Sequence, residues 1–282
     1  MWTRQELKNR GRNHFYKNYW AVIAVCFILA IFAGENGQSV TAIQESDSSS
    51  NWSVVMEVSD TVNNAFQWLS TLGSHAGSFL NQLAENLFNG FSSGQHWFFK
   101  VFQGGVFIAS GLAALALKLF IGNVFSVGSR RFCMENRERK VEIRRTLYGF
   151  RPGNYMNIVE VMFFKWLYIL LWSLLLIIPG IIKSYEYRMV PYILAENPSM
   201  DRKRALEISR TMMDGQKWNT FLLDLSFFLW QILSALTLGL AGIFYVNGYV
   251  LCTEGELYAI LRQNSLERQT VYYAELPGFY SH

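Results

Sequence analysis

The sequence contains several apolar runs that are about as long as a helix crossing a lipid bilayer. Such a helix needs about 20 residues to cross about 30 Å of hydrocarbon. The chain is 51% hydrophobic and only 16% charged, whereas an average soluble domain is roughly a quarter charged. This composition predicts an all-α membrane protein. It excludes a disordered chain, a collagen-like repeat and a small disulfide scaffold.

Six segments are candidate transmembrane helices, namely residues 18–34, 103–127, 157–178, 180–196, 218–238 and 240–261. The first opens with Tyr19 and Trp20, which suit the boundary between water and lipid. Basic residues precede it, so a cleaved signal peptide is the alternative interpretation. The long basic stretch and the poor cleavage site after Gly34 favour a retained anchor.

The apolar run from residue 157 to residue 196 would be about 60 Å long as one helix, twice the membrane thickness. Pro179 and Gly180 interrupt this run and predict a hairpin turn at that point. The return segment, residues 180–196, is short and contains charged side chains. Five crossings are therefore the alternative to six.

The placement of lysine and arginine tests the number of crossings. Neither occurs from Asn18 to Phe99, whereas residues 130–151 hold eight of them and residues 202–217 hold five. Because basic residues stay on the cytoplasmic side, six crossings place every basic cluster inside. Five crossings would translocate the second cluster. We therefore expect a multi-pass protein of the cell membrane with cytoplasmic N- and C-termini.

This topology divides the chain into five parts. They are a basic amphipathic cytoplasmic segment (1–17), the first transmembrane helix (18–34), an extracytoplasmic loop (35–100), a transmembrane core (101–262) and a cytoplasmic tail (263–282). The outer loop has apolar residues at helical spacing, which predicts amphipathic helices or a small subdomain. Within the core, residues 129–156 and 197–217 are predicted basic cytoplasmic loops. The second includes an interfacial helix whose basic face could meet anionic lipids or only orient the chain.

Charged side chains within the predicted spans are candidate functional residues, because charge is costly inside a membrane. Counted inward from the cytoplasmic ends of antiparallel helices, five of them fall about 9–15 Å deep. They are Lys118, Lys165, Arg188, Asp224 and Glu254, with Lys183, Glu186, Asn247 and Glu256 as secondary members. We expect Arg188 and Lys165 to neutralise Asp224 and Glu254. Such a layer could fix helix register by ion pairing, or it could line a hydrated site for a charged ligand.

The sequence carries no recognisable catalytic or cofactor-binding motif. Glycine-rich nucleotide loops, HExxH and GxSxG are all missing. Three cysteines, Cys26, Cys133 and Cys252, are too few and too scattered along the chain for a disulfide framework or a zinc site. A net charge of +4 without stacking motifs disfavours nucleic-acid binding. We expect no enzyme activity, no cofactor and no metal.

Residues 173–198 and 205–240 closely resemble an uncharacterised bacterial integral-membrane family, catalogued as domain of unknown function 975. The residues that carry the resemblance include Ile178-Pro179-Gly180-Ile181, Pro191-Tyr192-Ile193-Leu194, Asn197-Pro198, Ser209-Arg210, Lys217-Trp218 and Leu223-Asp224-Leu225-Ser226. Outside these stretches, Asn18-Tyr19-Trp20 and Gly149-Phe150 also fit, so the resemblance covers essentially the whole chain apart from the outer loop. It implies a membrane protein, but no established activity and no catalytic residues.

Two functions remain open from the sequence. The first is a non-enzymatic membrane protein that binds the lipid bilayer and a partner protein, peptide or lipid. The second is a small transporter or channel that uses the charged layer. A faint repeat favours the second, because Lys165-Trp166 and Lys217-Trp218 each open an apolar run that reaches a glycine.

Overall fold

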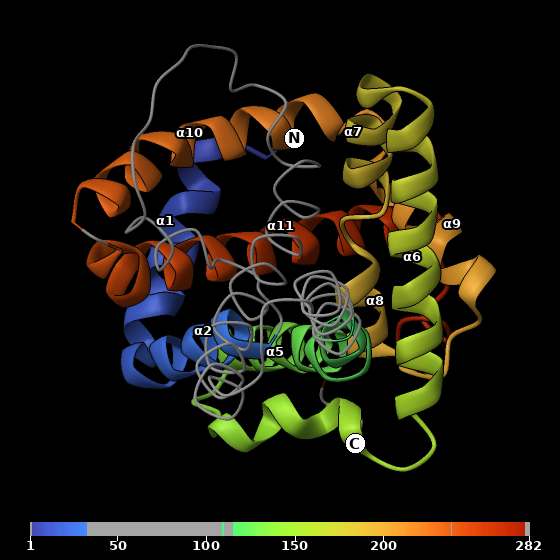
Figure 1. Ribbon diagram of the computed structural model, residues 1–282, viewed down its shortest axis with the longest axis horizontal. Coiled ribbons are helices and arrows are strands. Elements are labelled where there is room, and N and C mark those ends of the chain that lie inside the picture. The colour runs from blue at the N-terminus through green and yellow to red at the C-terminus, as the bar shows by residue number, and fades with distance from the viewer. Residues whose placement is uncertain (1, 33–108, 110–114, 238, 280–282) are drawn as a thin grey trace, which may run out of the picture.

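The computed structural model describes residues 2–32, 109, 115–237 and 239–279 (Figure 1). Every regular element in these ranges is a helix, which confirms the all-α class for the described part of the chain. The predicted outer loop, 35–100, and the first part of the predicted span 103–127 lie outside the described residues.

The α-helices are α1 (Arg4–Lys17), α2 (Tyr19–Phe32), α5 (Asn123–Asn136), α6 (Tyr155–Leu175), α7 (Ile177–Glu186), α8 (Val190–Glu196), α9 (Arg202–Met213), α10 (Lys217–Leu236) and α11 (Asn247–Glu267). Two π-helical turns, η2 (Lys118–Gly122) and η4 (Gly242–Val246), lead into α5 and α11, and η3 (Ile143–Phe150) is a 3₁₀ helix. In Figure 1, α10 and α11 run across the view, and α6 runs crosswise to both with α7 beside it. The helices are therefore not all antiparallel neighbours, which the predicted charged layer assumed.

The N-terminal segment is packed into the fold rather than lying freely on its surface. Leu7, Gly11 and Phe15 form the buried face of α1, which crosses α11. A Cβ atom at Gly11 would lie 2.8 Å from Cα of Thr253 and 2.9 Å from its backbone nitrogen. Such contacts are too short for any larger side chain, so glycine allows the two backbones to approach this closely.

The predicted hairpin between residues 157 and 196 begins three residues before the expected turn. The chain breaks at Leu176, whose backbone is extended (φ −157°, ψ 141°). Pro179 lies in the first turn of α7, where its missing N–H has no partner to lose. Gly180 packs against α6, since a Cβ atom there would lie 2.8 Å from Cα of Ser173. Pro179 and Gly180 thus begin the returning helix instead of forming the turn.

The predicted return span, residues 180–196, is not one helix. A turn at residues 187–189 separates α7 from α8, so α7 is only ten residues and about 15 Å long. This is half the hydrocarbon thickness. The buried α8 packs against α5 and α9 rather than continuing along α6.

The predicted basic loop 129–156 is largely helical. Helix α5 continues to Asn136, and its last turns are buried together with Arg131 and Glu135. The 3₁₀ helix η3 then packs against α5, where a Cβ atom at Gly128 would overlap the carbonyl oxygen of Thr146. Basic residues of this segment pair with the buried carboxylates of Glu135 and Glu256, so much of the segment is packed.

The second predicted basic loop and the predicted tail also fold onto the body of the protein. The interfacial helix is present as α9, with Asp201 as its N-cap and Gly215 in the left-handed region (φ 70°) just after its end. Beyond α11 the chain returns across α9 and buries Leu276 and Phe279. The tail is therefore part of the packed core.

Helix α6 is the described helix that is long and apolar enough to cross a membrane, while Tyr19–Ala30 is a shorter apolar helix. Large apolar side chains are also exposed on other elements. On α10 five of them form one stripe because their spacing is helical, namely Trp218, Leu225, Leu229, Ile232 and Leu236. Phe228, Trp230 and Leu233 are also exposed on this helix. At the tip of the α6–α7 hairpin they are Leu174, Leu175, Leu176 and Ile178. Exposed apolar surface of this extent is typical of lipid or protein contact.

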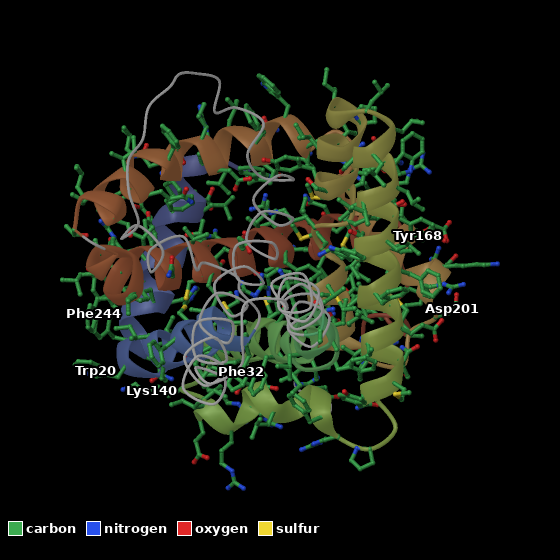
Figure 2. All side chains as sticks on the ribbon, viewed as in Figure 1. Trp20, Phe32, Lys140, Tyr168, Asp201 and Phe244 are labelled. Atoms are coloured by element: carbon green, nitrogen blue, oxygen red, sulfur yellow. The ribbon has the colours of Figure 1, made fainter. Side chains whose placement is uncertain are left out.

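Helix α2 packs against the π-helical turn η4, and this contact bears on the number of crossings. The Tyr19 hydroxyl donates a hydrogen bond to the carbonyl oxygen of Phe244, at 3.0 Å. The six-span topology places these residues on opposite sides of the membrane. Figure 2 shows Trp20, Lys140 and Phe244 at the same edge of the molecule. The turn η4, which leads into α11, therefore lies beside segments that the charge pattern assigns to the cytoplasm.

Candidate functional site

Arg188 is the centre of the most connected ionic cluster among the predicted site residues. Its guanidinium donates to both carboxylate oxygens of Asp224, at 2.5 and 2.8 Å, and to Glu254 at 2.7 Å. The Tyr185 hydroxyl donates to Asp224 at 2.9 Å, and Arg130 lies 3.9 Å from Glu254. Two cations and two carboxylates thus balance each other.

The local fold explains how this cluster forms. Arg188 lies in the turn between α7 and α8, whereas Asp224 lies on α10 and Glu254 on α11. Because α7 ends at Glu186, the Arg188 side chain projects toward both acidic helices. The three side chains are 15–22% exposed. Partial burial of charge is costly unless the groups are paired, and here each carboxylate has an arginine partner.

The structure separates the other predicted members from this cluster. Glu186 is bound by Lys183 at 2.5 Å and by Lys217 at 2.6 Å, which ties α7 to the start of α10. Lys165 lies on α6. Lys118 begins η2, and Asn247 directly follows η4. The pairing of Lys165 with Asp224 and Glu254 stays a prediction. It assumed antiparallel helices, whereas α6 runs crosswise to α10 and α11 (Figure 1).

Glu256 belongs to a second cluster, which joins α1, α5 and α11. Arg137 donates to its Oε1 at 2.5 Å, and Nδ1 of His14 lies 2.8 Å from the same oxygen. The side chain of Glu256 is 1% exposed. In the sequence Arg137 is one of a run of basic residues that mark the cytoplasmic side, so its role as a buried partner was missed.

Two further buried carboxylates were missed entirely. Glu135 accepts a hydrogen bond from Arg131 at 2.9 Å and lies 2.9 Å from Arg145. The guanidinium of Arg131 is stacked 3.7 Å from the ring centre of Tyr148. Helical spacing of Arg131 and Glu135, four residues apart, was a signal that could have identified this pair.

Glu196 anchors the C-terminal segment. It accepts hydrogen bonds from Arg262 at 2.8 Å, from the Tyr258 hydroxyl at 2.8 Å and from the backbone N–H of Gly278 at 2.7 Å. Its partners come from α11 and from the returning tail, which are far apart in the sequence from α8. Spacing in the sequence gave no signal for this long-range site.

The three cysteines, scattered in the sequence, are gathered by the fold. Cys26 on α2, Cys133 on α5 and Cys252 on α11 lie in one buried apolar cluster and are all free thiols. The Cys133 thiol donates to the carbonyl oxygen of Leu251 at 3.5 Å. Among the described residues, no group of three or more His, Cys, Asp or Glu side chains is arranged to hold a metal ion.

Together these clusters can hold helices at fixed positions, since each carboxylate named above has a basic partner within hydrogen-bond distance.

Comparison with known proteins adds a family but no activity. No curated protein and no solved structure matches the chain. The resemblance predicted from the sequence is confirmed over residues 161–265, which match the model of an uncharacterised family, Protein of unknown function (DUF975).

Proposed function

We propose that the chain is a non-enzymatic membrane protein that binds lipid at the cytoplasmic face of the cell membrane. The observation that carries this proposal is the exposed apolar stripe on α10 together with the exposed tip of the α6–α7 hairpin. Leu229 on the stripe is 73% exposed and Leu174 at the tip is 76% exposed. In Figure 1, α10 runs along the upper part of the molecule and the hairpin ends beside it.

Contacts among the basic segments support a common cytoplasmic side. Trp2 donates from its indole N–H to Gln216 at 3.0 Å, which joins the start of α1 to the end of α9. Lys17 donates to the carbonyl oxygen of Glu138, at 2.7 Å. Arg204 on α9 binds Glu275 of the tail, at 2.7 Å. Lysine and arginine mark the side that is not translocated, so these contacts favour one compartment for both termini.

In this proposal α10 lies along the membrane interface with its stripe against the acyl chains, as amphipathic helices do. The hairpin of α6 and α7 enters the same leaflet. The paired state of Asp224 and Glu254 favours a role in holding the helices together. A transporter needs charged groups that face a hydrated path, and the ion pairs with Arg188 speak against that alternative.

A fluorescence experiment tests the contact between α10 and lipid. Single cysteines replace Leu229 on the stripe and Tyr273 in the tail, which are 73% and 72% exposed and so form a matched pair. Each is labelled with bimane after reconstitution of the full chain into vesicles that contain brominated phospholipid. The native cysteines are buried, so they contribute little labelling.

We expect the brominated lipid to quench the label at residue 229 and to leave the label at residue 273 bright. We also expect alkaline carbonate to leave the chain in the membrane fraction. Equal fluorescence at both positions would contradict the proposed placement of α10. Release of the chain by carbonate would contradict membrane integration.

A further inference from the structure

A groove of about 640 Å³ lies between α1 and α10, and Tyr249 of α11 forms part of its wall. Arg4 and Lys8 contribute two positive charges to it. Amide groups come from Gln5, Asn9 and Asn219. The described residues that line the groove include no aspartate or glutamate, so its chemistry suits an anion.

In the part of the chain that the structure describes, neither cation of the groove forms an ion pair with a carboxylate. Among the described residues, no carboxylate forms an ion pair with Arg4, whereas Arg10 on the same helix binds Glu6 at 2.6 Å. Lys8 donates to the carbonyl oxygen of Ser226 at 3.1 Å, and its ammonium group lies 4.4 Å from the ring centre of Phe227. Partial burial, and then the charge of Arg4, lower the pKa of Lys8. A bound anion would relieve both effects.

The groove lies directly beside the apolar stripe of α10. Asn219 and Ser226 line the groove, are seven residues apart and share one face of the helix. The stripe residues Trp218 and Leu225 directly precede them, so the stripe occupies the adjacent face. A phospholipid has the same arrangement, with a charged phosphate next to apolar chains. Trp2 and Tyr249 at the groove are side chains typical of the lipid–water boundary.

We infer that this groove binds the phosphate group of an anionic phospholipid whose acyl chains lie along α10. Arg4 and Lys8 neutralise the phosphate, and the amides of Asn9 and Asn219 donate hydrogen bonds. The inference rests on the proposed function, because it needs α10 at the membrane interface. Inorganic phosphate shares the charge but lacks the acyl chains, so we expect it to bind much more weakly.

Native mass spectrometry of the full chain in detergent tests the inference, with dioleoylphosphatidylglycerol as the titrated lipid. Arg4→Gln is the test variant because Arg4 is exposed, so we expect the variant to fold like the unmodified chain. Arg10→Gln removes the same charge from the same helix outside the groove. We expect Arg4→Gln to weaken binding about fivefold, the effect of one cation near a lipid surface, and Arg10→Gln to change it less than about twofold. Thermal unfolding of both variants checks the fold.

If Arg4→Gln and Arg10→Gln weaken lipid binding equally, the lipid is attracted by the general surface charge. This result would overturn the inference that the groove is the binding site. Displacement of the lipid by an equal concentration of inorganic phosphate would overturn the lipid as its ligand. The bimane experiment separates this inference from the proposed function. If brominated lipid quenches residue 229 but Arg4→Gln binds lipid like the unmodified chain, only the groove inference fails. If residue 229 is not quenched, the proposed function itself fails.

Discussion

The guanidinium of Arg188 binds both carboxylate oxygens of Asp224, at 2.5 and 2.8 Å. The same guanidinium reaches Glu254 at 2.7 Å. One side chain therefore connects the α7–α8 turn to α10 and α11. Removing one member of such a pair leaves a partly buried charge without its partner, which costs more than the pair itself contributes.

We predict that Arg188→Gln and Asp224→Asn each lower the free energy of unfolding by about 2 kcal/mol, because both remove an ion pair that is mostly shielded from water. The double variant should cost less than the sum of the two. Denaturant unfolding in detergent measures all three. Arg202→Gln is the control, since its pair with the half-exposed Glu160 should be worth less than about 1 kcal/mol. Additive losses would show that Arg188 and Asp224 do not act as a pair.

The close crossing of α1 and α11 predicts whether replacing Gly11 stabilises or destabilises the protein. In an open helix, Gly→Ala stabilises by up to about 1 kcal/mol through helix propensity. At Gly11 the added carbon would meet the backbone of Thr253, so we expect Gly11→Ala to destabilise by about 1–3 kcal/mol. Asn13→Ala, at an exposed position of α1, is the control and should be neutral or slightly stabilising. A higher melting temperature for Gly11→Ala would contradict the close crossing.

The ion pair between Arg204 on α9 and Glu275 in the C-terminal tail predicts that stability depends on pH. The hydrogen bond from Arg204 lowers the pKa of Glu275 below its usual value, so the ionised form is favoured in the folded state. The ionised Glu275 therefore stabilises the fold fully above the carboxyl pKa of the unfolded chain, about 4.3. This stabilisation is lost as the pH falls through the lowered pKa of Glu275 in the folded protein.

We expect Glu275→Gln to lower stability by about 1 kcal/mol at most at pH 7, since the pair is partly exposed. The difference from the unmodified chain should shrink below about pH 4. Melting temperatures measured from pH 3 to pH 7 check this, with Glu267→Gln at the end of α11 as the control. A difference that persists unchanged at pH 3 would assign the effect to packing instead of charge.

The all-α class, the amphipathic interfacial helix and the family followed from local sequence signals. The helix predicted within residues 197–217 is present as α9, because helical spacing depends only on neighbouring residues. The ionic partners depended on how helices cross in space, which no local pattern specifies. The prediction for Lys165 counted depth along helices assumed to be antiparallel, whereas α6 runs crosswise to α10 and α11 (Figure 1). Glu196 was missed because its partners lie on α11 and the tail.

The positions of lysine and arginine also could not settle the number of crossings. A hairpin that crosses the membrane twice and a hairpin that lies at the interface leave their flanking basic residues on the same side. Charge placement therefore constrains only whether the number of crossings between two clusters is even. The hydrogen bond from Tyr19 to Phe244 joins the start of α2 to η4, and the interfacial position that we propose for α10 accounts for it.

Labelling from outside the cell tests this central claim most directly. Single cysteines are placed at Ser199 in the basic segment, at Thr237 between α10 and α11, and at Ser49 in the predicted outer loop. A membrane-impermeant maleimide is then added to intact cells. We predict labelling at residue 49, no labelling at residues 199 and 237, and labelling of residue 199 once the cells are opened. Labelling of residue 237 in intact cells would contradict the account, because α10 would then cross the membrane.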